Sequence, residues 1–570
     1  MKPAIPVIEP EDYRQQVVMK WIVLTVLGSA VFLNSLLGPF VFEDQRLDPD
    51  IHSLGLSNKA WLSPHRIANW TLAVNYAIHQ DRPLGYHLAN VLLHTLSGLV
   101  LFGLTCRTLL RQTDRPRLQE VAPWVAFVVA LLWMIHPLQT QSVTYVMGRA
   151  ELVAGLCFLL TVYGTLRGAE RPDESMAFFW YGLAVVACAL GMGEASYVAA
   201  APVLVFVFDR VYLSDSFAEA LRRRWALYIG FAACWALLAL PMLGTWTIAA
   251  GRDAQSYVLT QPGAILHYLH LTGWPRGLSF DYSDWPTTTA MADALVPGAV
   301  VIGLLAVSFF SLACCPKVGF PAVFFSLTLL PSSIIPEPAL VNEQRMHLPL
   351  AGLSVVAVLI VLALSQRVAA NAAVPEAVGL LIGLPVLAIL GYLTFQRNKL
   401  YDSPASLWQN TVETRPANTV ANAELARIRL KEAFALFQSG EFAKAVQTFR
   451  SILDAAHIPE DVRDAARRNL ALAEGMTGDV ESAARTLILA WNTDAERAAA
   501  LFTLGALLNN KKDYRGAEIA LREAVRLQSD KAANHFELAI SLKQQGKEKE
   551  AEAAKQAGLK IDPNFLKSKQ

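Results

Sequence analysis

Acidic and basic residues recur at the ends of apolar segments in the first 396 residues, where a charge needs a partner or a function. Glu43 and Asp44 follow the first apolar segment as an adjacent pair. A carboxylate at a membrane boundary is desolvated, which raises its pKa towards that of a useful base. Adjacent acids in a loop are more commonly solvated surface charge, so this pair alone is a weak signal.

Four further clusters of the same kind follow along the chain. They are His65 and Arg66 in SPHRIANW, His136, Arg149 and Glu151 in HPLQTQSVTYVMGRAELVAG, Glu194 at a tight turn, and Glu343, Arg345 and His347 in NEQRMHLPLAG. Each cluster alone is explained by a solvated loop or a helix cap. Together they suit an acid that accepts a proton from a hydroxyl, with cations that hold an anionic leaving group.

Other chemistries have less support. His267 and His270 could share a helix face, but they lack a nearby third ligand, so we expect no metal site. The sequence contains no Walker loop, Rossmann glycine pattern, GxSxG or HExxH. The six cysteines lie in apolar runs without zinc spacing, and the net charge of +1 provides no basic patch. We therefore expect no cofactor and no nucleic-acid partner, and the lack of a ligand set disfavours a divalent ion.

Composition divides the chain after Gln396. Residues 397–570 hold 49 of the 97 Asp, Glu, Lys and Arg residues, or 28% of that segment, whereas the first 396 hold 48, or 12%. A spanning helix needs about 20 apolar residues, and a window of that length predicts eleven spans. They are residues 20–42, 86–110, 122–137, 149–167, 176–191, 194–212, 225–244, 296–315, 320–335, 348–366 and 377–396. The shorter apolar stretch 261–275 is expected to be interfacial or re-entrant.

Basic residues orient the predicted bundle, because cytoplasmic loops are enriched in Lys and Arg. Arginines follow spans two and four and precede span seven, Lys317 follows span eight, and Arg367 follows span ten. All lie on one side if the N-terminus is cytoplasmic. An odd number of spans then places the C-terminal part outside the cytoplasm. This topology fits a bacterial inner membrane with a periplasmic tail, which we favour, or an endoplasmic reticulum membrane with a luminal tail.

The charged C-terminal part contains an internal repeat. Its segments GEFAKA, GDVESA, KDYRGA and GKEKEA close on Ala445, Ala483, Ala517 and Ala551, which are 38, 34 and 34 residues apart. Thirty-four residues is the tetratricopeptide (TPR) period, in which each unit is a helix pair that stacks on the next. We therefore expect an all-α protein with a transmembrane bundle at 1–396, connecting helices at 397–430 and a TPR solenoid at 431–570.

The order of these motifs resembles the transmembrane and tetratricopeptide-containing protein O-mannosyltransferase-like family, and in particular its bacterial members. The matching stretches are FVFED (40–44), residues 65–94, HPLQTQSVTYVMGRAELVAG (136–155), YLHLTGWPRGLSFDY (268–282) and EQRMHLPLAGL (343–353). This family belongs to the GT-C superfamily of integral-membrane glycosyltransferases. The resemblance implies a sugar donor linked to polyprenyl or dolichyl phosphate, and a protein hydroxyl as acceptor.

The resemblance also implies roles for the candidate residues. The family's acidic pair in the first outer loop is associated with catalysis, and this corresponds to Glu43 and Asp44. The family usually has two aspartates there, so Glu43 is a departure and Asp44 is the favoured base. Arg149 and Arg345 match family positions and are expected to bind the donor phosphate. The histidine and arginine of SPHRIANW, His65 and Arg66, are expected to assist them.

Two further departures affect the remaining candidates. The turn Met192-Gly193-Glu194 lacks the lysine that the family often has there, which disfavours a phosphate-binding role for this turn. His347 stands where the family tends to have tyrosine, which would alter donor contacts. The secondary site candidates are His136, Glu151, Glu194, Glu343 and His347.

The residues and the resemblance together predict an enzyme that moves a hexose such as mannose from a polyprenyl-phosphate donor to Ser or Thr hydroxyls of exported proteins. The transfer is expected to be a single inverting displacement. The bundle would lie among membrane lipids, and the TPR groove would hold the acceptor protein. One alternative is a non-catalytic, membrane-anchored assembly factor whose repeats recruit exported proteins. Another keeps the fold and glycosylates a lipid or a polysaccharide.

Overall fold

The structure is a computed structural model of the 570-residue chain. It describes residues 10–42, 65–112, 116–171, 173–245, 253–368, 374–491 and 493–563. Within these ranges, all regular secondary structure is helical, which confirms the predicted all-α class. The chain forms two compact units, Met1–Asn410 and Thr411–Gln570. The division between them falls a short way beyond the change in composition after Gln396.

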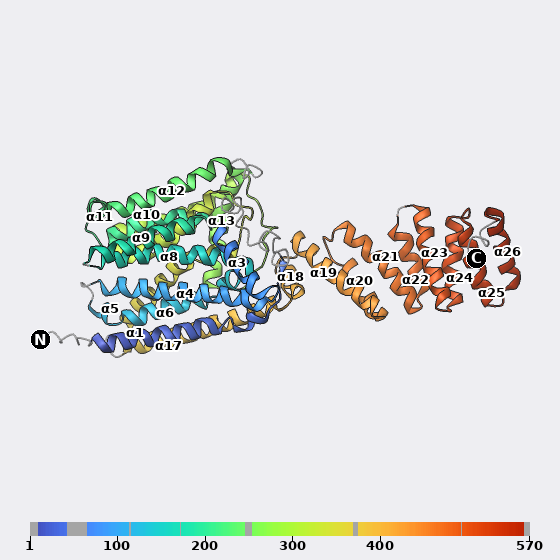
Figure 1. The fold of residues 1–570 in the computed structure, drawn as a ribbon, viewed down its shortest axis with the longest axis horizontal. Coiled ribbons are helices and arrows are strands. Elements are labelled where there is room, and N and C mark those ends of the chain that lie inside the picture. Colours follow the sequence, from blue (N-terminus) through green and yellow to red (C-terminus); the bar gives the residue numbers. More distant parts are fainter. Residues whose placement is uncertain are drawn as a thin grey trace. The chain divides into compact units, whose positions relative to one another are not determined.

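The first unit is built from long helices joined by shorter ones (Figure 1). The long helices are α1 (Pro10–Ala30), α4 (Pro83–Leu110), α6 (Ala122–Met134), α8 (Arg149–Ala169), α9 (Glu174–Met192), α10 (Ala201–Tyr212), α12 (Trp225–Thr245), α13 (Ala254–Gly273), α14 (Met291–Cys314), α15 (Pro316–Ile334), α16 (Pro349–Val368) and α17 (Val374–Asn398). The shorter helices are η1 (Leu33–Leu37), α3 (Arg66–His79), α5 (Pro116–Glu120), η4 (Pro137–Gln139), α7 (Thr140–Val143), η5 (Val146–Gly148), η6 (Ser196–Ala200), α11 (Phe217–Arg223), η8 (Glu343–Met346) and η9 (Lys399–Asp402). Helix α18 (Pro404–Thr414) crosses from the first unit into the second.

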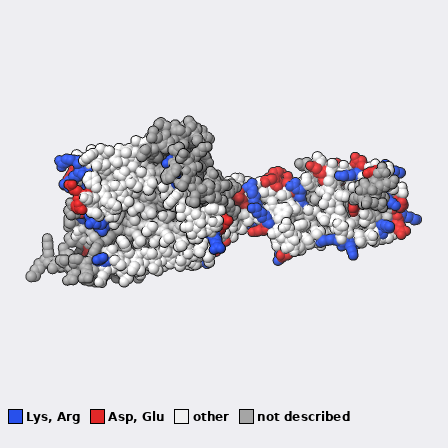
Figure 2. All heavy atoms as spheres, viewed as in Figure 1, with Lys and Arg blue, Asp and Glu red and all other residues white. Residues whose placement is uncertain are grey.

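A helix overlaps each of the eleven predicted spans. Among the described residues, five helices are long and apolar enough to cross a membrane, or up to seven if two bent helix pairs each form one span. The middle of this unit is almost entirely free of charged residues on the face shown in Figure 2. These features indicate a multi-pass membrane protein, and the number eleven stays a prediction. Helix α13, which contains most of the predicted interfacial stretch, is not among the candidate spans.

Large apolar side chains hold the bundle together. Trp133 of α6 and Phe158 of α8 are fully buried in its core. Helices α8 and α9 approach closely at Gly164, where an added Cβ would lie 2.9 Å from the backbone oxygen of Trp180. Small residues at such crossings let two backbones pack closely within a membrane.

Charged residues pair at the end of the unit that carries α5 and α11 (Figures 1 and 2). Arg107 and Arg167 both contact Glu170, at 2.9 and 3.1 Å. Arg224 contacts the buried Asp209 at 2.7 Å. These arginines are among the residues that oriented the predicted bundle. The end that carries α5 and α11 lies opposite the end that carries α3 (Figure 1).

The second unit is an array of helix pairs. The pairs are α19 (Thr419–Gln438) with α20 (Phe442–Leu453), α21 (Glu460–Thr477) with α22 (Val480–Ala490), α23 (Asp494–Asn510) with α24 (Tyr514–Leu527), and α25 (Ala532–Gln544) with α26 (Glu548–Ile561). The repeated alanines 445, 483, 517 and 551 all lie in the second helix of a pair and are buried. The sequence repeat is therefore a structural repeat, which supports the predicted TPR assignment. Helix α19 runs through residue 430, the predicted boundary between connecting helices and repeats.

Candidate functional site

A cavity of about 390 Å³ lies at the end of the first unit that contains α3. Its wall combines three kinds of side chain that small-molecule sites commonly use: aromatic rings, amides and titratable groups. The rings are those of Phe42, Tyr145 and Phe280, the amides those of Asn69, Gln141, Asn342 and Gln344, and the titratable groups those of His65, Glu151 and Asp281. Its volume is in the range of known ligand pockets.

Phe42 lines this cavity and directly precedes the acidic pair in the chain. Its backbone φ is 51°, in the left-handed region that is unfavourable for a bulky residue. Its ring packs edge-on against Trp408 and Phe280, with centroids 5.2 and 6.0 Å away. Backbone strain of this kind is typical of functional sites. Glu43 and Asp44 lie outside the described residues, so their catalytic role stays a prediction.

Glu194 caps the N-terminus of α3, which carries His65 into the cavity wall. Its carboxylate accepts hydrogen bonds from the backbone N–H groups of Ile67 and Ala68, at 2.7 and 3.2 Å. The N–H of His65 donates to the carbonyl oxygen of Gly193 at 3.1 Å. Burial raises the pKa of the Glu194 carboxyl, and the donated hydrogen bonds partly oppose that rise. In this structure Glu194 therefore positions α3.

Arg149 is fully buried and is not among the residues that line the cavity. Its guanidinium donates to the side chain of Asn90 and to the carbonyl oxygen of Tyr86, both at 2.8 Å, and to the side chain of Asn75. These bonds join the start of α8 to α3 and α4. The predicted role of Arg149 in phosphate binding stays a prediction, and its described contacts are those of a framework residue.

Arg345 is also buried outside the cavity wall. It pairs with Glu337 at 2.8 Å and donates to two backbone carbonyls of the same loop. Glu337 in turn accepts a hydrogen bond from Ser196 at 2.8 Å. Arg66, the first residue of α3, is likewise not among the lining residues.

Glu343 forms a buried ion pair with Arg397, at 2.6 Å. Its other oxygen accepts hydrogen bonds from the N–H of Ser279 and the hydroxyl of Tyr282, at 2.7 and 2.6 Å. Burial raises the pKa of Glu343, while the charge of Arg397 and these donors oppose the rise. The contacts join η8, the end of α17 and the segment around Phe280. They therefore position part of the cavity wall.

His136 and His347 are buried and hydrogen-bonded to other residues of the bundle. The N–H of Leu138 donates to Nδ1 of His136 at 3.2 Å, so Nε2 carries the proton and donates to the carbonyl oxygen of Thr272 at 3.0 Å. Nδ1 of His347 donates to the side-chain oxygen of Gln139 at 2.6 Å. Burial lowers the pKa of His347 well below its usual value. Neither residue lines the cavity.

Of the candidates within the described residues, His65 and Glu151 are the two that line the cavity. The amides of the wall were not predicted from the sequence, above all Gln141, Asn342 and Gln344. They lie inside the quoted motifs, but the site candidates were chosen as titratable or charged residues, and an amide is neutral. Arg397 was not predicted either. It directly follows the last predicted span, and none of its sequence neighbours indicates its buried partner.

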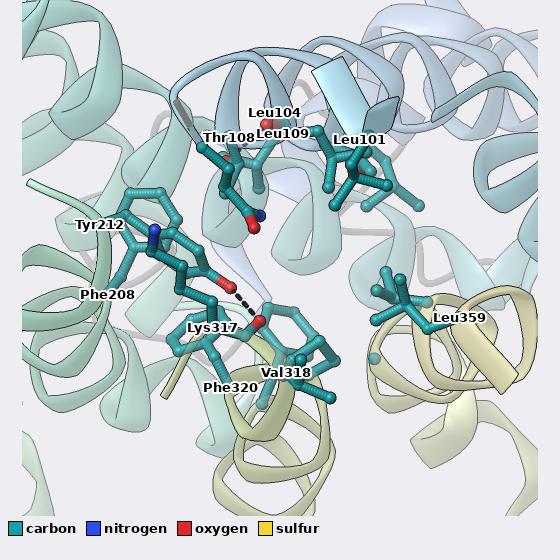
Figure 3. A pocket seen from close by; sticks show the side chains of 18 residues that line it. Leu101, Leu104, Thr108, Leu109, Phe208, Tyr212, Lys317, Val318, Phe320 and Leu359 are labelled. Atoms are coloured by element: carbon teal, nitrogen blue, oxygen red, sulfur yellow. Dashed lines mark hydrogen bonds between the residues drawn. The ribbon is translucent and has the colours of Figure 1, made fainter. Parts of the chain in front are cut away.

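The first unit also contains a second cavity. This smaller cavity of about 90 Å³ lies between α4, α10, α15 and α16 and is lined mainly by apolar side chains (Figure 3). Within it the hydroxyl of Tyr212 donates to the backbone oxygen of Lys317 at 2.8 Å, and no candidate site residue lines it. In the described part of the chain, no cluster of three or more His, Cys, Asp or Glu residues could hold a metal ion.

No family model matches the chain, but it is similar to animal proteins named as protein O-mannosyl-transferases. It is 43% identical over 99 residues to Tmtc3 of Drosophila melanogaster, covering 16% of this chain and 11% of that protein. It is 32% identical over 147 residues to human TMTC4, and this match covers 24% of this chain and 19% of that protein. It is 26% identical over 302 residues to Drosophila Tmtc2, and this match covers 47% of this chain and 31% of that protein. The predicted resemblance to protein O-mannosyltransferases is confirmed, whereas the assignment to bacterial members stays a prediction. The matches span less than a third of these relatives' own lengths.

Among solved structures, the chain is similar to an Archaeoglobus fulgidus oligosaccharyltransferase that was crystallised with a tethered acceptor peptide containing the NVT sequon. The match covers 72% of this chain and 58% of that one, with 13% sequence identity and a TM-score of 0.38. Similarity at this level is too low to carry an argument about site or activity.

Proposed function

We propose that the chain is an integral-membrane glycosyltransferase that moves a hexose from a polyprenyl-phosphate donor to Ser or Thr hydroxyls of exported proteins. The observation that carries the proposal is the cavity beside α3. Its wall combines aromatic, amide and titratable groups, and one residue of that wall, Phe42, directly precedes the acidic pair in the chain. The resemblance to protein O-mannosyl-transferases supports the same class of reaction.

In the proposed mechanism, Asp44 accepts the proton of the acceptor hydroxyl, with Glu43 as its neighbour or substitute. The hydroxyl oxygen forms a bond to the anomeric carbon as the bond from that carbon to the phosphate oxygen breaks. Attack opposite the leaving group inverts the anomeric configuration. The polyprenyl phosphate departs with one more negative charge than it carried in the donor, and the proposal needs no metal or cofactor.

The growing charge on the phosphate requires a cationic or hydrogen-bonding partner. His65 is the candidate for this role that lines the cavity. Arg149 and Arg345 remain candidates on the strength of the family resemblance. Their present contacts imply that they would have to exchange protein partners for the phosphate.

We further propose that the helix pairs of the second unit bind the acceptor protein. Stacked helix pairs of this kind form a continuous concave surface that suits extended peptides. The basic residues near α5 and α11 support a cytoplasmic location for that end of the bundle. The cavity and the repeats would then lie outside the cytoplasm, in a bacterial periplasm.

The test is hexose transfer by the full chain in membrane vesicles, supplied with a polyprenyl-phosphate hexose and exported proteins, and read by mass spectrometry of Ser and Thr peptides. Asp44→Asn should lower transfer at least 100-fold, because a general base contributes about 10²–10⁴-fold. Asp173→Asn is the matched control. Asp173 is an exposed N-cap at the start of α9, where asparagine caps equally well.

The outcome distinguishes the enzyme from a membrane-anchored assembly factor. Full transfer activity in both Asp44→Asn and Glu43→Gln would rule out an acidic base at this position. No hexose transfer by the wild-type chain to any protein acceptor would contradict the proposed function itself.

A further inference from the structure

We infer that Gln141 and Glu151 form a subsite that recognises hydroxyl groups of the sugar ring. This inference rests on the proposed function, because it assumes that the cavity holds the sugar of the donor. Both side chains line the cavity, and each presents a buried oxygen that has no hydrogen-bond partner within the described residues. A buried acceptor without a partner is costly, so such atoms commonly await a ligand or water.

The orientation of the Gln141 amide is determined by its contacts. Its nitrogen donates to the backbone oxygen of Phe280 at 2.9 Å. Only the NH₂ group can donate to a carbonyl, so the remaining atom, Oε1, is the acceptor that has no partner. The residue is 5% exposed. Gln141 is therefore held by the cavity wall with one acceptor still available.

Glu151 supplies the second acceptor. It lies in the first turn of α8, and its backbone oxygen accepts a hydrogen bond from the hydroxyl of Tyr197 at 3.3 Å. Its carboxyl atom Oε2 is buried and has no partner among the described residues. The position of α8 is secured by the bonds of the neighbouring Arg149. Glu151 can therefore accept a hydrogen bond from a ligand without a large movement of the helix.

The hydrogen-bonding character of these two side chains indicates which part of the lipid-linked sugar substrate they bind. A phosphate offers acceptor oxygens and negative charge, so the free amide oxygen of Gln141, which can only accept, disfavours it. A pyranose offers hydroxyl donors, which complement both. The rings of Tyr145 and Phe280, whose centroids are 5.2 Å apart, add an apolar wall beside them. The subsite therefore suits the sugar, and the phosphate would bind elsewhere in the cavity.

The experiment compares two probes on the purified full chain in lipid nanodiscs: a short-chain polyprenyl phosphate that carries mannose, and the same polyprenyl phosphate without sugar. Calorimetric titration gives the affinity for each. The wild type should bind the mannosylated probe more tightly. Gln141→Met and Glu151→Met should each lower that affinity about tenfold, the effect of losing one such hydrogen bond. Affinity for the bare probe should not change.

Gln112→Met is the matched control, because Gln112 is equally buried but lines the other cavity. Probes with one sugar hydroxyl replaced by hydrogen sharpen the test. One such deoxy probe should bind the wild type about tenfold more weakly, with no further loss in Gln141→Met, because both changes remove the same hydrogen bond.

Three results would overturn the inference. The first is equal affinity of the wild type for the mannosylated and the bare probe, and the second is that the variants lose the same affinity for both of these probes. The third is that, for every deoxy probe, the loss from the missing hydroxyl and the loss from the substitution simply add. Failure of the proposed function is separable from these results. Sugar-dependent binding without transfer to protein would remove the transferase proposal and keep the subsite. Transfer to protein by the wild type, together with unchanged sugar discrimination in both variants, would keep the transferase proposal and remove the subsite.

Discussion

Glu194 shows how a single acidic residue can support a site without entering it. Its carboxylate binds two N–H groups at the start of α3, a helix whose N-cap residue, His65, makes no side-chain cap of its own. His65 also adopts a φ of 59°, which is unfavourable for a residue with a side chain. The position of this histidine in the cavity wall therefore depends on Glu194, although the two are far apart in the sequence.

We expect Glu194→Ala to destabilise the start of α3 by about 1–2 kcal/mol, the usual effect of losing a helix cap. Hydrogen exchange should show faster exchange of the Ile67 and Ala68 amides. Glu174→Ala is the control, because Glu174 also lies in the first turn of a helix but is exposed. Unchanged protection of both α3 amides in Glu194→Ala would show that the cap contributes nothing.

At the scale of elements, the turn within each helix pair of the second unit has a common backbone geometry. Gly440, Gly478 and Gly546 have φ values of 83°, 96° and 78°, and the equivalent residue of the third pair is Lys512, with a φ of 66°. A positive φ is strained for a side-chain-bearing residue and free of strain for glycine. The third pair therefore carries a local cost that the other three avoid.

We expect Lys512→Gly to stabilise the second unit by about 0.5–1 kcal/mol, since relief of the strained φ exceeds the added entropy of glycine in the unfolded chain. The control is Lys511→Gly, which should destabilise the unit because Lys511 has a φ of −78°. Thermal unfolding of both variants measures the difference. A lower melting temperature for Lys512→Gly than for the wild type would contradict the expectation.

At the scale of the whole first unit, the ion pair of Glu343 and Arg397 joins segments that are distant in sequence. It connects η8 to the end of α17, and through Ser279 and Tyr282 it also holds the segment that carries Phe280. Removal of one partner leaves the other charge buried and unpaired. The stability of the cavity wall therefore depends on the last helix of the bundle.

We expect Arg397→Met to destabilise the unit by about 3–5 kcal/mol, the usual effect of breaking a buried pair. Arg107→Met should cost about 0–1 kcal/mol, because the Arg107 side chain is 38% exposed in its pair with Glu170. Unfolding of both variants in the same detergent allows the comparison. Equal stability losses would show that burial does not determine the strength of the Arg397 pair.

The elements of this protein could be predicted from the sequence because their signals are local. An apolar run of about 20 residues predicts a helix wherever it lies, and every predicted span overlaps one. The spacing of Ala445, Ala483, Ala517 and Ala551 likewise marked the helix pairs, because each repeat folds in the same way as its neighbours. The motifs also indicated the family resemblance that the comparisons confirm.

The composition of the site was decided by the tertiary structure. Charge and position identified Arg149, Arg345 and Glu343 as candidate site residues. In the structure all three are buried in contacts within the bundle, and their predicted roles stay predictions. The cavity wall instead combines His65 and Glu151 with amides and rings from several separate segments. The sequence shows that a residue is polar, and the hydropathy of its neighbours shows that it lies near a helix end. Whether its polar atoms meet a protein partner or a cavity depends on how the helices pack, and that information is not local in the sequence.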